Sequence, residues 1–365
     1  MRRREFAAAV GGAVVAAARV GHAGQRPDPV APSGSITDVP GLKVGHFTDS
    51  RRPTGCTAIL FDEPAAAAVD YDGSAPGETQ VVLLQPVSPV DAIHAILLSG
   101  GGVWGLGAVA GAMRFHEDRK IGFDWGSPGG LRIPIVVGAI IDDLAVGDSR
   151  IRPDPESAYK ACEAASAAPV AEGNVGAGAG GTVGRMLQGQ GMRGMKGGLG
   201  TASLRLGDVA IGALAVVNAA GDIFDWRTGK IVAGARRADG AGLADTVATL
   251  KKNLGSGTPH GRLEVDDPVL RSTTLLVVAT NIAYSKTQLG KIAMMANAGG
   301  FWTIRPYHTT GDGDQLFAVS TGRLRADVPV SVTGALAAEV VAEAIVRGVM
   351  AAKSVPGWTA AAELG

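Results

Sequence analysis

The sequence predicts an α/β protein of layered sheets and helices, and two observations support this prediction. Short apolar segments typical of strands alternate along the chain with helical segments made of small residues. The 365 residues include 54 glycines, and 46% of the chain is hydrophobic while only 19% is charged. Because charged residues make up roughly 25% of typical soluble domains, this composition indicates a compact protein whose backbone segments pack closely.

The segments that predict the layers follow one another in order. Short apolar runs bounded by Gly, Pro or Asp are expected to form buried segments or strands, at residues 42–47, 57–61, 81–84, 92–98, 133–141, 214–218, 275–279 and 316–320. Helical composition marks a small-residue segment that ends near His116 and residues 155–168, 286–297 and 331–352. Since the two kinds of segment alternate, helices are expected on both faces of the sheets.

The charge and the cysteine count exclude some functions. Lys and Arg total 34, and Asp and Glu also total 34, so the formal net charge is 0. A neutral chain lacks the usual electrostatic basis for binding nucleic acid or an anionic membrane. Cys56 and Cys162 are the only cysteines, too few for a disulfide framework. We expect two buried thiols, and a single bridge is the alternative.

The N-terminus is typical of an export signal. Residues 1–23 combine a basic start, a short apolar stretch and small residues before a cleavage point. The apolar stretch is shorter than the roughly 20 residues that span a bilayer, and Arg3-Arg4 resembles a twin-arginine signal. We therefore expect a signal peptide at 1–23, a linker at 24–35 and a single domain at 36–365 of a periplasmic or secreted protein. The alternative is an amphipathic N-terminal helix.

A glycine-rich segment at 174–184 is the first candidate site. Its glycines are spaced almost as in dinucleotide-binding loops, but such a loop follows a strand and opens a helix. Here the segment follows a helical one, and no convincing ribose-binding acid stands downstream. We expect no nicotinamide or flavin cofactor, and instead a loop whose backbone amides approach a substrate or a neighbouring chain.

Ser99 is the second candidate, because it lies between an apolar strand and a glycine-rich turn. The nucleophile elbow of serine hydrolases has the pattern G-x-S-x-G, and position 97 is Leu. His94 and His116 are near in sequence. A structural turn fits this segment better, and a Ser99 hydrolase stays open as an alternative.

The third candidate is the run RSTT at 271–274, directly before the apolar strand at 275–279. Hydroxyl groups at such a place often make turn or strand-end hydrogen bonds. The functional interpretation is that the protein cuts its own chain here and frees a threonine amine. A threonine hydroxyl is a weak nucleophile that its own α-amine can activate, and that amine has a reference pKa of roughly 7.7 to 8.0.

The fourth candidate is the pair Asp312 and Asp314, which flank a glycine. Two carboxylates on one turn can orient an amine or hold a cation, although single DGD triplets are common in solvated turns. The full EF-hand pattern is absent, and the six histidines include no pair at ligand spacing, so no metal site is expected.

Six segments, taken together and in order from residue 36 onward, show a resemblance to a known family. They are VPGLKVGHFT (39–48), PTGCTAILF (53–61), HAILLSGGGVWGL (94–106), GNVGAGAGGTVG (173–184), STTLLVVATN (272–281) and HTTGDGDQLFAV (308–319). The chain resembles the self-processing L-aminopeptidase/D-esterase family, which also holds β-peptidyl aminopeptidases and nylon-oligomer endo-hydrolases.

The resemblance implies a precursor that cuts itself into α and β chains, which stay together in an αββα sandwich and form oligomers, a tetramer being favoured. It implies that Thr273 is the nucleophile, so the cleaved bond is Ser272–Thr273, the α chain ends at 272 and the β chain spans 273–365. Asn218 then helps to hold the oxyanion, a role in which one donor contributes around 3 kcal/mol. Asp312 and Asp314 match the acidic pair beside the processing and catalytic centre, where an anion raises the pKa of the α-amine.

Three positions depart from the family pattern. Many relatives have Asn or Gly before the cut, where this chain has Ser272. Arg185 replaces a lysine at the end of the glycine-rich segment; arginine keeps the charge but cannot give up a proton, and Lys196 does not match the position. Some relatives have a tyrosine before an aspartate, and this tyrosine donates to the oxyanion. The matching position here is Asp142, followed by Asp143, and the Asp142 carboxylate cannot donate unless it is protonated. Shifting the match by one residue puts Ile141 there, which has no donor.

The sequence thus predicts an N-terminal-nucleophile hydrolase of amide bonds that needs no cofactor. Its substrates would be N-terminal residues of short peptides, β-peptides, amino-acid amides or esters, or polyamide oligomers. The alternatives are acyl transfer of the glutamate N-acetyltransferase type, the Ser99 hydrolase, and a non-catalytic binding or assembly protein on the same fold.

Overall fold

Two sheets joined by one long strand form the centre of the structure. The computed structural model describes residues 30–364 apart from 127, 241 and 256–271, so the predicted signal peptide and most of the linker lie outside the described residues. Met1–Ala31 is a separate unit of which two residues are described, and Pro32–Gly365 is the second unit. The joining strand is β2 (Gly55–Asp70): its first part pairs with β1 (Leu42–Thr48) and β4 (Ile93–Ser99), and its end pairs with β16 (Gln315–Leu324).

Each sheet contains one parallel pair of strands. The first sheet has the order β10 (Gly198–Leu206), β11 (Val209–Val217), β14 (Leu275–Ile282), β16 and the end of β2, and β14 runs parallel to β16. The second sheet contains β1, the start of β2, β4, β7 (Val136–Ile140) and β3 (Glu78–Thr79), and β4 runs parallel to β7. The shorter strands are β5 (Phe123–Asp124), β6 (Arg132–Ile133), β8 (Thr182–Val183), β9 (Met195–Lys196), β12 (Asp222–Phe224), β13 (Ile231–Ala233) and β15 (Ile304–Arg305).

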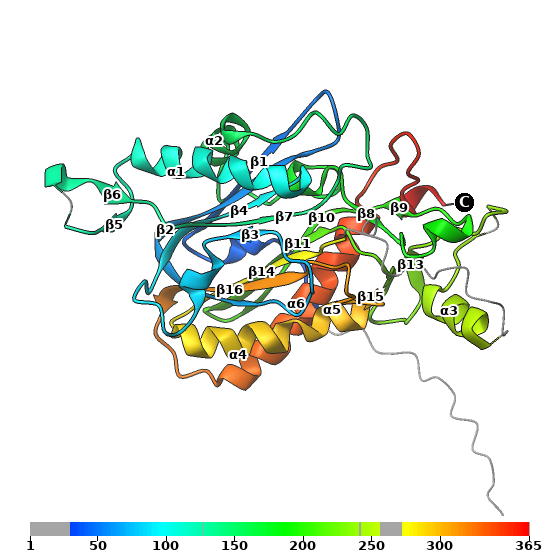
Figure 1. Ribbon diagram of the computed structural model, residues 1–365. Coiled ribbons are helices and arrows are strands. Elements are labelled where there is room, and N and C mark those ends of the chain that lie inside the picture. Colours follow the sequence, from blue (N-terminus) through cyan, green and yellow to red (C-terminus); the bar gives the residue numbers. More distant parts are fainter. Residues whose placement is uncertain (1–29, 127, 241, 256–271, 365) are drawn as a thin grey trace, which may run out of the picture. The chain divides into compact units, whose positions relative to one another are not determined.

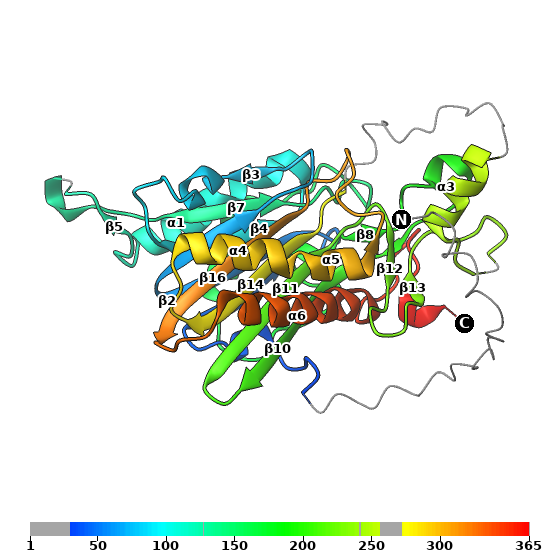
Figure 2. The same cartoon turned by 90° about the horizontal axis from the view of Figure 1, so that it is seen from below.

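Helices cover the outer faces of both sheets (Figure 1). The second sheet is covered by α1 (Val109–Glu117) and α2 (Pro155–Glu163), and the first sheet by α4 (Lys286–Ala296) and α6 (Val330–Met350). Figure 2 shows α4, α5 (Ala298–Thr303) and α6 lying across the first sheet. α3 (Thr246–Gly255) lies to one side, near β13. Capping boxes at Asp154 and Ser285 begin α2 and α4.

The alternation of side chains along the strands builds three apolar layers. Leu276 and Val278 of β14 pack toward α4 and α6, while Leu275 and Val277 pack toward the second sheet. The second sheet alternates in the same way, because Leu97 of β4 belongs to the cluster with α1 and α2. Both sheets are therefore apolar on two faces, as expected for strands buried on both sides. This is an αββα sandwich, and the predicted fold is confirmed.

Two expected strands differ from the structure. Residues 81–84 form a 3₁₀ helix, because an apolar run of four residues suits a helical turn as well as a strand. The strand expected at 57–61 is the middle of β2, which extends to Asp70. Among the described residues, no helix combines the length and the apolar character needed to span a bilayer.

Candidate active site

Three strand ends meet at one edge of the first sheet. β14 and β16 run parallel with Leu275 opposite Gln315, so the residues that precede both strands lie at the same edge. β11 runs antiparallel to β14 with Val216 opposite Leu275, so the residue that follows β11 reaches this edge as well. The register brings together the sequence-predicted residues Ser272, Thr273, Asn218, Asp312 and Asp314.

The peptide bond between Ser272 and Thr273 lies at the centre of this edge. Thr273 is 4% exposed, and its hydroxyl donates to the carbonyl oxygen of Ser272 at 2.7 Å. The backbone N–H of Gly313 donates to the same oxygen at 2.9 Å. A Cβ on Gly313 would lie 2.9 Å from Thr273 Oγ1, so only glycine brings its N–H this close without crowding the hydroxyl. The Ser272 carbonyl is thus polarised by two donors, one of which is the hydroxyl of the next residue.

The two carboxylates of the 312–314 turn have different environments. Asp314 Oδ1 accepts the N–H of Thr274 at 2.6 Å, so this carboxylate anchors the residue after Thr273. Asp312 Oδ2 accepts the backbone N–H and the hydroxyl of Thr309 at 2.9 and 2.7 Å. Its Oδ1 is buried and has no hydrogen-bond partner among the described residues. Burial, followed by the nearby charge of Asp314, raises the pKa of Asp312 to about 7.

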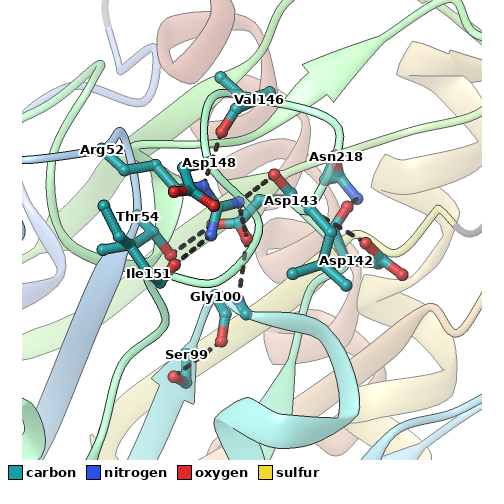
Figure 3. Close-up of polar contacts among 12 residues, drawn as sticks. Arg52, Thr54, Ser99, Gly100, Asp142, Asp143, Val146, Asp148, Ile151 and Asn218 are labelled. Carbon is teal, nitrogen blue, oxygen red and sulfur yellow. Dashed lines mark hydrogen bonds and ion pairs between the residues drawn. The ribbon is translucent and has the colours of Figure 1, made fainter.

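Asn218 connects the first sheet to the second. Its Oδ1 accepts the backbone N–H and the hydroxyl of Thr182 at 3.0 and 3.2 Å. These two donors fix the orientation of the amide, because only the oxygen can accept them. Its Nδ2 donates to the main-chain carbonyl of Asp142 at 3.3 Å, and Figure 3 shows the two residues side by side. The glycine-rich segment therefore contributes to the site through Thr182, whose backbone N–H and hydroxyl orient the Asn218 amide.

Arg185 and Asp142 bring opposite charges to the site. Arg185 is 4% exposed; burial lowers the pKa of its guanidinium, and the charge of Asp142 opposes that shift. Asp142 is half-buried, and its Oδ1 accepts the N–H of Leu144 at 3.1 Å. A carboxylate in this place adds an acceptor where some relatives have a donor, and the side-chain amide that faces it is that of Asn218, whose Nδ2 donates to the Asp142 main-chain carbonyl.

Lys196 holds the glycine-rich segment in place. It is fully buried, and its Nζ donates to the carbonyl oxygens of Gly178, Gly181 and Gly197 at 3.3, 2.9 and 2.8 Å. Three donated hydrogen bonds use every hydrogen of an ammonium group. Burial nevertheless lowers the pKa of Lys196 to about 7. Since Gly181 precedes Thr182, this lysine supports the donors that orient Asn218.

A buried ion pair that the sequence analysis missed anchors the loop after β7. Arg52 and Asp143 pair at 2.6 Å, and both side chains are completely excluded from solvent. Figure 3 shows the guanidinium among main-chain carbonyls, with bonds to Val146 at 2.6 Å and to Ile151 at 2.7 Å. Asp143 also accepts the hydroxyl of Thr54 at 2.6 Å. The sequence shows only two adjacent arginines in the segment RRPTG. It does not show that Arg52 pairs with Asp143, because the two residues are far apart in the chain.

The Ser99 alternative lacks the geometry of a serine–histidine pair. The Ser99 hydroxyl donates to the carbonyl of Gly100 at 3.1 Å. His94 Nδ1 accepts the N–H of Ile135 at 3.1 Å, and His116 Nδ1 contacts the carbonyl of Ala112 at 2.8 Å.

Cys56 and Cys162 are free and buried, and burial raises the pKa of both thiols to about 12. Within the described part of the chain, no group of three His, Cys, Asp or Glu residues is arranged to hold a metal ion.

Solved structures share this fold. The L-aminopeptidase D-Ala-esterase/amidase of Ochrobactrum anthropi, described as a variant of the Ntn hydrolase fold, matches with a TM-score of 0.64 at 22% identity over 92% of each chain. A β-aminopeptidase of Burkholderia sp. matches with a TM-score of 0.63 at 21% identity, over 93% of this chain and 95% of that one. The fold is therefore that of the N-terminal-nucleophile hydrolases.

The sequence comparisons give the family. Residues 34–362 match peptidase family S58. An uncharacterised aminopeptidase of Mycobacterium tuberculosis is 37% identical over 352 residues, which is 88% of this chain and 95% of the relative. A 6-aminohexanoate-oligomer endohydrolase of Kocuria sp. is 31% identical over 332 residues, which is 85% of this chain and 84% of the relative. The chain belongs to peptidase family S58 and is a hydrolase of amide bonds, so the resemblance drawn from the sequence is confirmed.

Proposed function

We propose that this chain cuts itself between Ser272 and Thr273 and then uses Thr273 to release N-terminal residues from short peptides, amides or esters. One observation supports the proposal above all: the Thr273 hydroxyl and the Gly313 N–H both donate to the Ser272 carbonyl oxygen, at 2.7 and 2.9 Å. A nucleophile and an oxyanion donor therefore already lie on the bond to be cut.

In the self-cleavage step, Thr273 Oγ1 would attack the Ser272 carbonyl carbon, and its proton would pass to the amide nitrogen of Thr273. The C–N bond breaks, which leaves an ester between Ser272 and the Thr273 oxygen and a free α-amine on Thr273. Water then hydrolyses the ester to the Ser272 carboxylate and the Thr273 hydroxyl. The Gly313 N–H would stabilise the negative charge that develops on the Ser272 oxygen.

The new α-amine would serve as the base in the second reaction. The Thr273 nitrogen lies 2.8 Å from the carbonyl oxygen of Asn218, which would orient the amine after the cut. The hydroxyl attacks the substrate carbonyl, the amine takes its proton and passes it to the leaving amine, and water hydrolyses the acyl-enzyme. In this scheme Asn218 Nδ2 donates to the oxyanion and Arg185 supplies positive charge nearby.

Negative charge around the site supports a substrate that carries an ammonium group. Burial raises the pKa of the Tyr307 hydroxyl well above its usual value, and the charges of four carboxylates raise it further; these are Asp314, Asp312, Asp70 and Asp72. The chain as a whole is neutral, so this concentration of acid is local. A free N-terminal amine would be attracted to it. The ends of 6-aminohexanoate oligomers, named for the Kocuria relative, also include an ammonium group, and the proposal extends to them.

Export and assembly complete the proposal. Residues 1–23 have the layout of a twin-arginine signal, which supports release into the periplasm or the medium, and the α and β chains would stay together in an oligomer. Fractionation of cells that produce the full chain tests export, because replacing Arg3 and Arg4 by lysine should retain the protein in the cytoplasm. Sedimentation of the purified protein tests the oligomer.

The decisive experiment is intact mass and N-terminal sequencing of purified protein under denaturing conditions. We expect a fragment that begins Thr273-Thr274-Leu275 and ends at Gly365. Thr273→Ala should stay uncut and inactive, whereas Thr273→Ser, which keeps a hydroxyl, should cut and hydrolyse. A wild-type chain that stays intact after long incubation would overturn self-cleavage.

Substrate class is tested on matched peptides with a free or an acetylated N-terminus, on amino-acid amides and esters, and on 6-aminohexanoate oligomers. We expect turnover to require the free amine. Transfer of the acyl group to an added amine in preference to water would instead identify an acyltransferase.

A further inference from the structure

The peptide bond between Ser272 and Thr273 has a different environment on each face of the first sheet. Side chains at this end of β14 alternate in direction: Leu276 packs toward α4 and α6, and Leu275 packs toward the second sheet. The same alternation places the side chain of Thr273 on the inner face, toward the second sheet, and the side chain of Ser272 on the outer face. The nucleophile and the Ser272 hydroxyl are therefore on opposite faces of the bond to be cut.

Asp312 lies beside Ser272 on the outer face. A parallel bridge pairs the two residues, and residues directly opposite each other in paired strands point to the same face. In this bridge the N–H of Gly313 donates to the Ser272 carbonyl oxygen at 2.9 Å. Leu316, which shares the face of Asp312 by alternation, packs toward α4 and α6. The register thus places the Ser272 hydroxyl and the Asp312 carboxyl next to each other, on the face opposite to Thr273.

Three buried oxygen atoms on the outer face have no hydrogen-bond partner among the described residues. They are Ser272 Oγ, Asp312 Oδ1 and Thr274 Oγ1, and their residues are no more than 2% exposed. Buried polar atoms in folded proteins are nearly always paired, and ordered water pairs with those that protein groups do not reach. Three such oxygens on one face, next to the scissile bond, are typical of a place that binds water.

We propose that Ser272 Oγ and Asp312 Oδ1 hold the water molecule that completes self-cleavage, with Asp312 as its general base. The inference rests on the proposed function, because it names the groups that act on the ester formed in that reaction. The other oxygen of the carboxyl, Oδ2, accepts two hydrogen bonds from Thr309, at 2.9 and 2.7 Å, which fix the group in place. Burial raises the pKa of Asp312 to about 7, which suits a base that works near neutral pH.

In this step the water oxygen would bond to the Ser272 carbonyl carbon from the outer face, and one water proton would pass to Asp312. The bond from this carbon to Thr273 Oγ1 breaks on the inner face. Oγ1 takes a proton from the new α-amine, which is an ammonium group below its reference pKa of roughly 7.7 to 8.0. The second water proton stays on the Ser272 carboxyl group until that group ionises. The Gly313 N–H stabilises the oxyanion, as in the first step.

The test uses hydroxylamine, which cuts an ester and leaves a hydroxamate. Asn-Gly bonds, which hydroxylamine also cuts, do not occur in this sequence. Asp312→Asn can still accept the hydrogen bonds of Thr309 but cannot serve as a base, so it should slow ester hydrolysis by about 10² or more. We expect this variant to accumulate the ester. After denaturation it should run as one chain without hydroxylamine and as two chains with it, and mass spectrometry should find the hydroxamate on Ser272.

The Ser272 hydroxyl is tested by a matched pair of variants. Ser272→Thr and Ser272→Val have the same shape, and only the first keeps a hydroxyl. Ser272→Val should accumulate the ester and complete cleavage up to about tenfold more slowly than Ser272→Thr, the effect of one hydrogen bond. This pair keeps the inference testable if Asp312→Asn does not fold, and thermal unfolding measures the folded fraction of each variant. Thr273→Ala is the control, because it cannot form the ester and should stay uncut in hydroxylamine.

The outcomes separate the two claims. If the wild type neither cuts itself nor is cut by hydroxylamine, the proposed function fails. If the wild type cuts itself, Asp312→Asn cuts itself as fast as the wild type, and Ser272→Val as fast as Ser272→Thr, the water site is wrong. Folded variants that stay intact even in hydroxylamine would show that the two residues act before the ester forms, and they would also overturn the inference.

Discussion

The backbone N–H of Thr273 donates to the main-chain carbonyl oxygen of Asn218 at 2.8 Å, so one residue positions the nucleophile with its backbone and faces the site with its side chain. The contact joins the end of β11 to the residues before β14. A substitution at Asn218 can therefore remove the amide group while the backbone contact stays.

Asn218→Ala should lower kcat by about 10² to 10³, the usual effect of removing one oxyanion donor, with a smaller change in KM. Thr182→Val is the matched control, because it removes the hydroxyl that orients the Asn218 amide and leaves the backbone N–H of Thr182 in place. The fall in kcat should be smaller in Thr182→Val than in Asn218→Ala. Steady-state kinetics on an amino-acid amide measures both, and an Asn218→Ala enzyme with wild-type kcat would exclude the assigned role.

The pKa of Asp312 predicts how stability changes in mild acid. The pKa of this carboxyl rises from 3.8 to about 7 in the folded protein, because of burial and the charge of Asp314. Between these values the folded chain binds more protons than the unfolded one, so the free energy of unfolding falls as the pH rises through this window. Asp312→Asn should flatten that fall. Urea unfolding at a series of pH values measures it, and an unchanged slope would contradict the prediction.

Lys196 predicts the opposite slope at higher pH. Burial lowers the pKa of its ammonium from 10.5 to about 7, so between these values the unfolded chain binds more protons and stability rises with pH. Lys196→Met should remove this rise. It should also destabilise the fold by about 3 kcal/mol or more, because three buried carbonyls lose their donor at about 1 to 3 kcal/mol each. The same unfolding series checks both effects, and a wild-type slope in Lys196→Met would refute the first.

Adjacent arginines offer a matched test of burial. Arg52 pairs with Asp143 with both side chains fully buried, whereas in the pair of Arg51 with Asp49 the arginine side chain is 68% exposed and the carboxylate 7%. Arg52→Met leaves a buried charge without its partner and should lower the free energy of unfolding by about 3 to 5 kcal/mol. Arg51→Met should lower it much less, because the Arg51 guanidinium is exposed to solvent in the folded protein as well as in the unfolded chain. Similar losses in the two variants would show that burial is not the deciding factor.

Two glycines should respond to alanine in opposite directions. A Cβ on Gly200 of β10 would overlap the carbonyl oxygen of Ala344 in α6, so Gly200→Ala should push the helix from the sheet and lower stability by about 1 to 3 kcal/mol. A Cβ on Gly290 in α4 would have Ala68 Cβ as its nearest neighbour, at 4.0 Å. Gly290→Ala should raise stability by about 0.4 to 1 kcal/mol, because it restricts the unfolded chain. Thermal melts of both variants decide, and a stable Gly200→Ala protein would show that α6 can move away.

Local patterns predicted the layers and the strand ends that form the site, because apolar runs and the residues next to them are continuous in sequence. The run of alanines at 65–68 hid the second half of β2, since alanine favours helices and only pairing with β16 makes this segment a strand. Contacts between distant segments left little signal. The pairing of Arg52 with Asp143 and the hydrogen bonds of Lys196 to Gly178 and Gly181 depend on the folded geometry, and no spacing in the sequence encodes them.

The strand order of the first sheet has a consequence for the two chains that self-cleavage would produce. β14 and β16 belong to the segment after Thr273, and they lie between β11 and β2, which precede it. The two strands of the smaller product would thus lie inside its partner's sheet, with β14 hydrogen-bonded to β11 and β16 to β2, and its own helices α4 and α6 would cover them. Such products cannot exchange or separate without unfolding the sandwich. Self-cleavage would leave the native size unchanged on a sizing column. Each small chain would stay bound to the large chain from which it was cut.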